Sequence, residues 1–528
     1  MTATPASGRT SRVAGWWEIP RGIVDPILRR PLASFHLIVT LAVILTVFGL
    51  IMVLSASSVE GYSRDGSAYG LFATQVVFAI LGSILFYVAL RVPVRHIRRL
   101  AAPMIVVTTV MLALVLIPGV GTLSNGARRW FVVAGFSVQP SELVKLALCV
   151  WGAHLLSSRL REQASLKELL VPLVPVAFLV CTLIILEPNL STTITIAIIV
   201  GTLLWFAGLH IRVFVMFVVT GAALAVVLAL VEGYRSQRVQ SFLGNIDDPQ
   251  GAGYQARQAR YALANGGLFG QGLGQSRAKW NYLPNAHNDF IFAIIGEELG
   301  LLGGLTVIAL FVLLAFVGLR IALRAVDPFL RMMTAAITVL ISVQALINIG
   351  YVIGLLPVTG IQLPLLSAGG TSTFTVLVML GLLANAARHE PEAVAALAAT
   401  GDGRIGRFLR LPQPESYVPP RVQQWRARRA ESGPAARPAR RADQRAPRGD
   451  GRRNPPPGDR GQARRRGPAA YFGFGQQAPM PERRRRPAPA PTYDDPGWRS
   501  SRPVPVPRAR VRSSVGSDRW PGPPGSRW

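Results

Sequence analysis

The sequence predicts an all-α integral membrane protein of about ten transmembrane helices, followed by a disordered basic tail. Half of the 528 residues are hydrophobic, and the apolar residues gather in runs long enough to cross a bilayer, which takes about 20 residues. Arginine and lysine recur in every second short loop, as the positive-inside rule expects of a multi-pass protein. The composition then changes abruptly near residue 390, where the apolar runs stop.

The apolar runs define ten expected spans. They lie at residues 34–56, 69–90, 101–118, 140–157, 168–186, 190–208, 211–231, 290–319, 332–356 and 369–387. Only a few residues separate the fifth span from the sixth and the sixth from the seventh. Residues 1–33 are polar and basic, so we expect a cytoplasmic N-terminal segment and no cleavable signal peptide.

The basic residues of the short loops set the expected orientation. Those predicted to be cytoplasmic are Arg21, Arg29, Arg30, Arg91, Arg95, Arg98, Arg99, Arg159, Arg161, Lys167, Arg320 and Arg324. Both termini are then cytoplasmic, and residues 119–139, 232–286 and 357–368 face outward. The outward loops nevertheless contain Arg128, Arg129, Arg235, Arg238, Arg257, Arg260, Arg277 and Lys279. These cations oppose the bias and therefore predict an anionic ligand on the outer face.

The C-terminal region, expected to begin at residue 391, has a different character. Residues 389–528 contain 29 arginines, no lysine and 12 acidic residues, a net charge of +17, together with 24 prolines. Such a segment cannot bury enough apolar surface to fold, so we expect a disordered cytoplasmic tail. Attraction to anionic lipid explains its charge. Nothing in it indicates nucleic-acid binding.

No cofactor is required by the sequence. Cys149 and Cys181 both fall within apolar spans and are interpreted as small core residues rather than a disulfide or metal pair. We find no phosphate-binding glycine loop preceded by a strand and no His/Cys ligand cluster. A metal site is therefore not predicted, and the need for a divalent cation is left open.

Candidate catalytic chemistry begins with three carboxylates on one apolar segment. Asp289 opens the eighth span, and Glu297 and Glu298 lie about two turns further in. An ionised carboxylate in hydrocarbon costs several kcal/mol unless it is paired or hydrated, so intramembrane carboxylates are candidates for function. Capping of the helix by Asp289 is the structural alternative. The two glutamates are interpreted as polar contacts between helices.

A second candidate cluster surrounds the start of the fourth span. Pro140 suits the first turn of a helix, and Glu142 and Lys145, three residues apart, share one face. An ion pair with no functional role explains that spacing well. A functional interpretation adds Arg129, whose forked donors match phosphate oxygens, with Lys145 as a second positive charge.

Two further loops carry weaker signals. The glycine-dense stretch 266–276 suggests a tight outward loop whose backbone approaches a ligand or partner closely. In the loop 356–372, Ser367, Gly369 and Gly370 precede the last span and could present main-chain N–H groups to an anion, although an ordinary helix cap explains the hydroxyls equally well. Glu187 has two interpretations. A hydrated carboxylate at the membrane interface explains it at least as well as a role in the site does.

The order of these motifs resembles the SEDS (shape, elongation, division and sporulation) family. The matching segments are Gly-Ala-Arg-Arg-Trp at 126–130, Gln-Pro-Ser-Glu at 139–142, Ala-His-Asn-Asp-Phe-Ile-Phe-Ala at 286–293, Gly-Glu-Glu-Leu-Gly at 296–300 and the loop from Pro357 to Ser372. The resemblance covers about residues 34–390 and is closer to the cell-division branch than to the rod-elongation branch. Asn189 and Ser191 depart from the family pattern, so residues 187–191 are given no catalytic role.

The resemblance implies a peptidoglycan glycosyltransferase that polymerises lipid II at the outer membrane face during septal wall synthesis. It implies that Asp289 is the catalytic base and that Arg129, Lys145, Arg257 and Lys279 bind the diphosphate, with Glu142 orienting Lys145. His287, Ser367, Gly369 and Gly370 complete the expected substrate site. A class B penicillin-binding protein is the implied partner, together with other division proteins. An elongation polymerase, a lipid II flippase and a division scaffold are the alternatives.

Overall fold

The computed structural model describes residues 30–417, except 125, 134, 162–165, 232, 245–251, 281–282, 284–285, 402–403 and 416. Nearly all of the expected N-terminal segment and most of the expected tail therefore lie outside the described residues.

Within the described residues, ten long helices form the membrane domain, and they match the ten expected spans closely. They are α2 (Ala33–Asp65), α3 (Gly70–Arg91), α4 (Val94–Val115), α5 (Pro140–Arg161), α6 (Leu166–Leu186), α7 (Leu190–Phe206), α8 (Ile211–Val231), α11 (Ile291–Arg324), α12 (Pro328–Val352) and α13 (Gly370–Arg388). Counting only residues that the structure describes, six of the ten are long and apolar enough to cross a membrane, and α6, α7 and α8 contain shorter apolar stretches. The helical membrane fold is thus confirmed.

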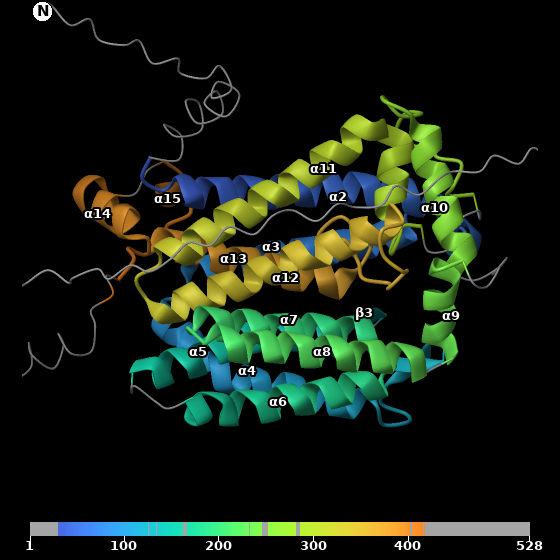
Figure 1. The fold of residues 1–528 in the computed structure, drawn as a ribbon. Coiled ribbons are helices and arrows are strands. Elements are labelled where there is room, and N and C mark those ends of the chain that lie inside the picture. Colours follow the sequence, from blue (N-terminus) through green and yellow to red (C-terminus); the bar gives the residue numbers. More distant parts are fainter. Residues whose placement is uncertain are drawn as a thin grey trace, which may run out of the picture. The chain divides into compact units, whose positions relative to one another are not determined.

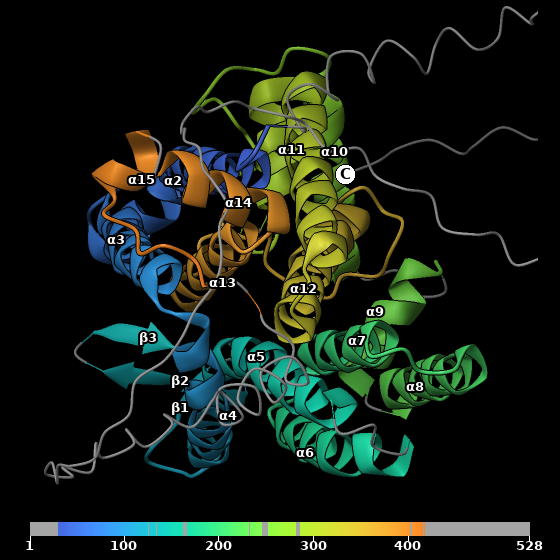
Figure 2. The same cartoon turned by 90° about the vertical axis from the view of Figure 1, so that its left-hand side faces the viewer.

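The long helices run side by side, and the shorter elements gather at their two ends (Figures 1 and 2). At one end lie α9 (Gly233–Phe242) and α10 (Ala252–Gly266), and we call this the α10 end. At the other lie α14 (Pro391–Thr400) and α15 (Arg404–Phe408), and we call this the α14 end. Buried aliphatic and aromatic side chains from nine of the described long helices form one continuous core, and α8 packs against it through the partly buried Phe217.

A small sheet adds to the expected all-α fold. Strands β1 (Thr122–Ser124), β2 (Ala127–Val133) and β3 (Phe136–Val138) pair antiparallel in the order β1-β2-β3. They occupy the segment expected to be an outward loop. Gly126 and Gly135 supply the left-handed turns between the strands, with φ values of 76° and 83°. Three strands of this length leave little trace in a hydropathy pattern.

Helix α11 is broken at Gly300, and the glycine-dense loop fills the break. Gly300 has φ 68° and ψ −166°, a conformation outside the helical region. The amide of Leu301 donates to the carbonyl of Gly267 at 2.9 Å, while the carbonyl of Glu297 accepts from the amide of Gln271 at 2.9 Å. A Cβ added at Gly270 would lie 2.1 Å from the carbonyl oxygen of Glu298. The backbone that this loop approaches is therefore that of α11, and the loop restores hydrogen bonds that the break removes.

The boundary expected at residue 391 is too early. Beyond it, Glu392 accepts hydrogen bonds from Arg324 at 2.9 and 3.0 Å, and Leu397 and Leu411 are buried. The hydroxyl of Tyr87 on α3 also donates to the carbonyl of Leu409 at 3.0 Å. Enough apolar side chains therefore follow the last span to dock α14 and the segment after it on the α14 end.

Candidate active site

The main chain at Asp289 is held firmly by α12. Its carbonyl oxygen accepts a hydrogen bond from Nδ2 of Asn348 at 3.0 Å and another from the hydroxyl of Tyr351 at 2.6 Å. The N-cap residue of α11 is Phe290, and no side chain caps this helix. The capping alternative for Asp289 is therefore wrong. The carboxylate therefore does not cap the helix. Its position is fixed by the hydrogen bonds that Asn348 and Tyr351 donate to the main-chain carbonyl of the same residue.

The carboxylate of Asp289 is half-buried at the α10 end. Burial raises its pKa above the ordinary value, while electrostatic interaction with Arg238, and after it with His287, acts in the opposite direction. A Cβ added at Gly360 would lie 3.6 Å from Oδ2 of Asp289, so the carboxylate faces the loop between α12 and α13. A carboxylate of raised proton affinity beside two basic groups has the properties of a general base.

His287 connects the Asp289 turn to two other parts of the chain. Its Nδ1 lies 2.8 Å from Oε2 of Glu60 on α2, and its carbonyl accepts from the amide of Ala368 at 2.9 Å. The sequence did not single out Glu60 because the first span was expected to end at residue 56. The helix instead continues to Asp65, and this extension brings Glu60 to His287.

The predicted residues Ser367, Gly369 and Gly370 lie in the same region and have clear structural roles. The hydroxyl of Ser367 accepts from the amide of Leu363 at 2.8 Å. The amide of Gly369 donates to Oε1 of Gln75 at 3.2 Å, so this N–H is already used. A Cβ at Gly369 would lie 2.0 Å from the side chain of Gln362, and one at Gly370 would lie 2.2 Å from the ring of Phe78. Close packing explains both glycines, and their contact with substrate stays a prediction.

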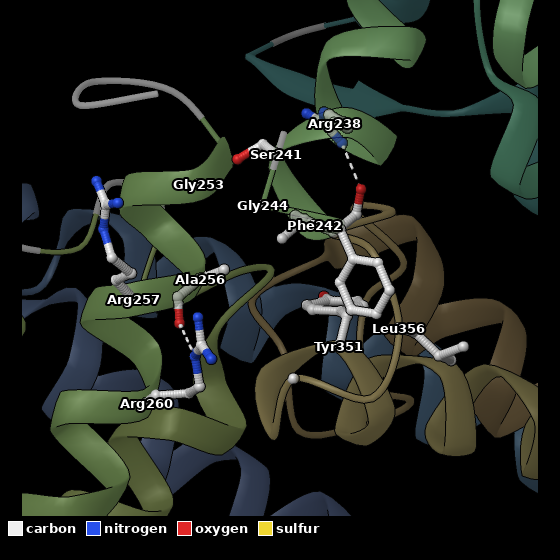
Figure 3. Close-up of a pocket in the computed structure, with 12 residues that line it drawn as sticks. Arg238, Ser241, Phe242, Gly244, Gly253, Ala256, Arg257, Arg260, Tyr351 and Leu356 are labelled. Carbon is white, nitrogen blue, oxygen red and sulfur yellow. Dashed lines mark hydrogen bonds between the residues drawn. The ribbon is translucent and has the colours of Figure 1, made fainter. Parts of the chain in front are cut away.

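A basic cavity of about 360 Å³ opens beside this region (Figure 3). Arg238 of α9 and Arg257 and Arg260 of α10 contribute to its lining, with Tyr351 as part of the wall. Nη1 of Arg238 donates to the carbonyl of Val358 at 3.1 Å. The hydroxyl of Tyr351 also bonds the Asp289 carbonyl, so the cavity and the Asp289 turn share one side chain. Arg257 was predicted from the sequence to bind the diphosphate, whereas Arg238 and Arg260 were predicted only to be outward cations.

The side chain of Lys279 is largely covered and contacts the protein. Its Nζ lies 3.8 Å from Oε1 of Glu298 and donates to the carbonyl of Gly274 at 2.5 Å. Glu298 also accepts from the hydroxyl of Ser55 on α2 at 2.6 Å, which is the expected contact between helices. Glu297 has a different role, because it accepts from the hydroxyl of Ser276 at 2.5 Å and holds the loop before Lys279.

Arg129 fastens strand β2 to the turn between α6 and α7. Its Nε and Nη2 each donate at 2.7 Å, to the carbonyls of Glu187 and Pro188 respectively. The side chain of Glu187 is fully buried, so the expectation of a hydrated carboxylate is wrong. Burial raises the pKa of Glu187 to about 8, against the opposing charge of Arg129.

The predicted pair of Glu142 and Lys145 is present at the start of α5. Nζ of Lys145 lies 2.7 Å from Oε1 of Glu142, and the lysine is buried. Direct contacts thus unite the His287 and Asp289 turn with the Ser367 to Gly370 loop. Arg257 lies in the neighbouring cavity, whereas Arg129, Lys145 and Lys279 each bind partners of their own. Among the residues that the structure describes, no group of three His, Cys, Asp or Glu side chains could hold a metal ion.

Comparison with known proteins identifies the family of the chain. The family described as "Cell cycle protein", FtsW/RodA/SpoVE, matches residues 35–392. The chain belongs to the FtsW/RodA/SpoVE family. It is 55% identical over 447 residues to the probable peptidoglycan glycosyltransferase FtsW of Mycobacterium tuberculosis, covering 84% of this chain and 83% of that protein. It is 40% identical to stage V sporulation protein E of Bacillus subtilis, covering 67% and 96% of the two chains.

Solved structures of the FtsW/RodA/SpoVE family share the fold. The rod shape determining protein RodA of Thermus thermophilus is 27% identical with a TM-score of 0.50, and the match covers 67% of this chain and 96% of RodA. A chain from a structure described as "Structural coordination of polymerization and crosslinking by a peptidoglycan synthase complex" gives a TM-score of 0.55 at 26% identity, covering 67% and 97%. The SEDS resemblance is therefore confirmed.

Proposed function

We propose that this chain is a peptidoglycan glycosyltransferase that polymerises lipid II into glycan strands during cell division. The observation that carries the proposal is the half-buried Asp289 carboxylate, fixed through its main chain and adjoining an arginine-lined cavity. The name of the mycobacterial relatives supports the reaction, and their 55% identity supports cell division over elongation.

The reaction needs one base and a stabilised leaving group. The 4-hydroxyl oxygen of the acceptor sugar attacks the anomeric carbon of the donor, forming the new glycosidic C–O bond. The bond from that carbon to the diphosphate oxygen breaks, and undecaprenyl diphosphate leaves with the electron pair. Asp289 accepts the hydroxyl proton. A single displacement inverts the anomeric centre, so no second carboxylate is needed as nucleophile.

The leaving diphosphate requires cations more than it requires an acid. One cavity is lined by Arg238, Arg257 and Arg260. A guanidinium group can donate two parallel hydrogen bonds to the oxygens of one phosphate. In our proposal this cavity receives the diphosphate. Lys145 and Lys279, both paired with glutamates, would assist only by exchanging those partners for substrate.

The proposed orientation follows the arginine-rich loops. The α14 end carries Arg91, Arg95, Arg98 and Arg99 and is assigned to the cytoplasm, so the α10 end and Asp289 face outward at the division septum. We assign a class B penicillin-binding protein as partner, in contact with residues 232–286. The solved relative described as part of a peptidoglycan synthase complex supports a partner of this kind.

Purified protein incubated with lipid II tests the proposal directly. Reactions with and without the cognate transpeptidase are separated on a gel, and we expect a ladder of glycan strands. A folded protein that yields no polymer even with its transpeptidase would refute the activity. Movement of lipid II across vesicles by that same inactive protein would instead support the flippase alternative.

A further inference from the structure

A second cavity lies at the α14 end, away from Asp289. Its volume is about 450 Å³, and it opens between the α3–α4 connection, the start of α12, the end of α13 and residues 412–415 and 417. The charged residues that line it are Arg91, Arg95, Arg98, Arg388, Asp327 and Glu415. Nothing in the proposed polymerisation reaction uses this cavity.

The lining carries more positive than negative charge. Arg98 pairs with Asp327 and lies over the ring of Phe329, with 4.9 Å from its guanidinium carbon to the ring centroid. Nη1 of Arg95 lies 3.8 Å from Oε1 of Glu415, but the side chains are 62% and 68% exposed, so this pair contributes little. The lining therefore contains four guanidinium groups and two carboxylates, and the ion pair of Glu415 is the weak one.

The other two arginines of the lining also form hydrogen bonds with neutral oxygens. Nη1 of Arg388, a buried side chain, lies 3.0 Å from the carbonyl oxygen of Pro412. Nη1 of Arg91 lies 3.0 Å from the hydroxyl of Tyr87. Burial also lowers the pKa of His389 at the same cavity, which favours its neutral form. Because four arginines share this lining with two carboxylates, the cavity is suited to a phosphate group.

The surroundings indicate where the phosphate would come from. Residues 418–528 contain 26 arginines and eight acidic residues, so the chain's own tail is a poor source of anions. On the helices that meet at the cavity, Ile84, Val88 and Leu100 are exposed apolar side chains, as expected where a helix faces lipid. Basic pockets between helices at the cytoplasmic surface bind the headgroups of anionic lipids.

We infer that this cavity binds the phosphate headgroup of an anionic glycerophospholipid of the cytoplasmic leaflet. The acyl chains would lie along the exposed faces of α3 and α4. The headgroup would also bridge the membrane helices and the segment that starts the tail, because Leu411 is buried in the core and Arg388 already binds the carbonyl next to it. Occupation of the cavity should therefore stabilise the folded protein.

The test is a lipid titration of the full-length protein in a neutral detergent. Dioleoylphosphatidylglycerol and dioleoylphosphatidylcholine are added separately, and bound lipid is measured by native mass spectrometry alongside the melting temperature. We expect the anionic lipid alone to bind and to raise the melting temperature. The double variant Arg91→Gln/Arg95→Gln should weaken its binding tenfold or more, and lipid II polymerisation should stay within twofold of the parent.

A matched control is Arg99→Gln/Arg407→Gln. It also removes two exposed charges from the α14 end, but neither arginine lines the cavity. Equal weakening by both double variants would show general surface attraction and overturn the site. Equal binding of the two lipids, or complete displacement of the lipid by inorganic phosphate at millimolar concentration, would also overturn it. These readouts do not depend on polymerisation, so failure of the proposed activity would be seen separately.

Discussion

Replacing Asp289 with Asn removes the proposed base while leaving the contacts that position it. Asn348 and Tyr351 bond the main-chain carbonyl at 3.0 and 2.6 Å, and an amide of nearly the same shape does not disturb them. We expect lipid II polymerisation to fall by about 100-fold or more, the usual scale for loss of a general base. This corresponds to about 2.7 kcal/mol of transition-state stabilisation, at 1.36 kcal/mol for each factor of ten.

The stability of the Asp289→Asn variant should be equal to that of the parent or higher. Burial raises the pKa of Asp289 in the folded state, so the folded protein binds this proton more tightly than the unfolded chain does. The contribution of Asp289 to stability is therefore full at acidic pH and is lost as pH rises through the folded-state pKa. Asn has no such dependence. In the parent, polymerisation should decline as pH falls through that same raised pKa, because the base becomes protonated.

The assay follows glycan strands on a gel at several pH values, with melting temperature measured on the same preparations. Glu392→Gln is the control, since it neutralises an exposed carboxylate at the α14 end and should leave the rate unchanged. Polymerisation by Asp289→Asn within threefold of the parent would refute the assignment of Asp289 as base. The failure of helix capping as an explanation would then leave the residue without a known role.

Other predictions concern the supports of the site. Arg129→Lys keeps the charge but loses one of two hydrogen bonds to the α6–α7 turn, so polymerisation should fall tenfold or more; an unchanged rate would remove Arg129 from the site. Gly300→Ala places a Cβ 2.4 Å from a main-chain nitrogen at φ 68° and should sharply lower the melting temperature. Gly221→Ala, with nothing within 4 Å, should not, and equal melting of the two would contradict the packing argument. Truncation after Tyr417 should retain polymerisation in the same gel assay, whereas truncation after Glu392 removes buried leucines and should lower the yield of folded protein; equal yields would show that α14 is dispensable.

The amino-acid sequence determined the number, order and approximate ends of the long helices. This succeeds because a bilayer requires each span to satisfy its own backbone hydrogen bonds and to be apolar over a fixed length. It also determined the pairing of Glu142 with Lys145, since a spacing of three residues on a helix is a local property. The family followed from the order of short motifs, which needs no knowledge of contacts.

Only the tertiary structure decided which side chains meet across the fold. Glu60 and His287 are more than 200 residues apart in sequence, and their contact depends on how far α2 extends. The glycine-dense loop could not be assigned to the break in α11, because a main-chain hydrogen bond to a distant segment leaves no pattern of side chains. Asp289 illustrates the same limit. Its sequence position suggested a helix cap, but α11 begins at Ile291 and its N-cap is Phe290. The turn before α11 is instead anchored by α12 through the carbonyl oxygen of Asp289. Every amino acid has such a carbonyl, so the sequence contains no sign of this contact.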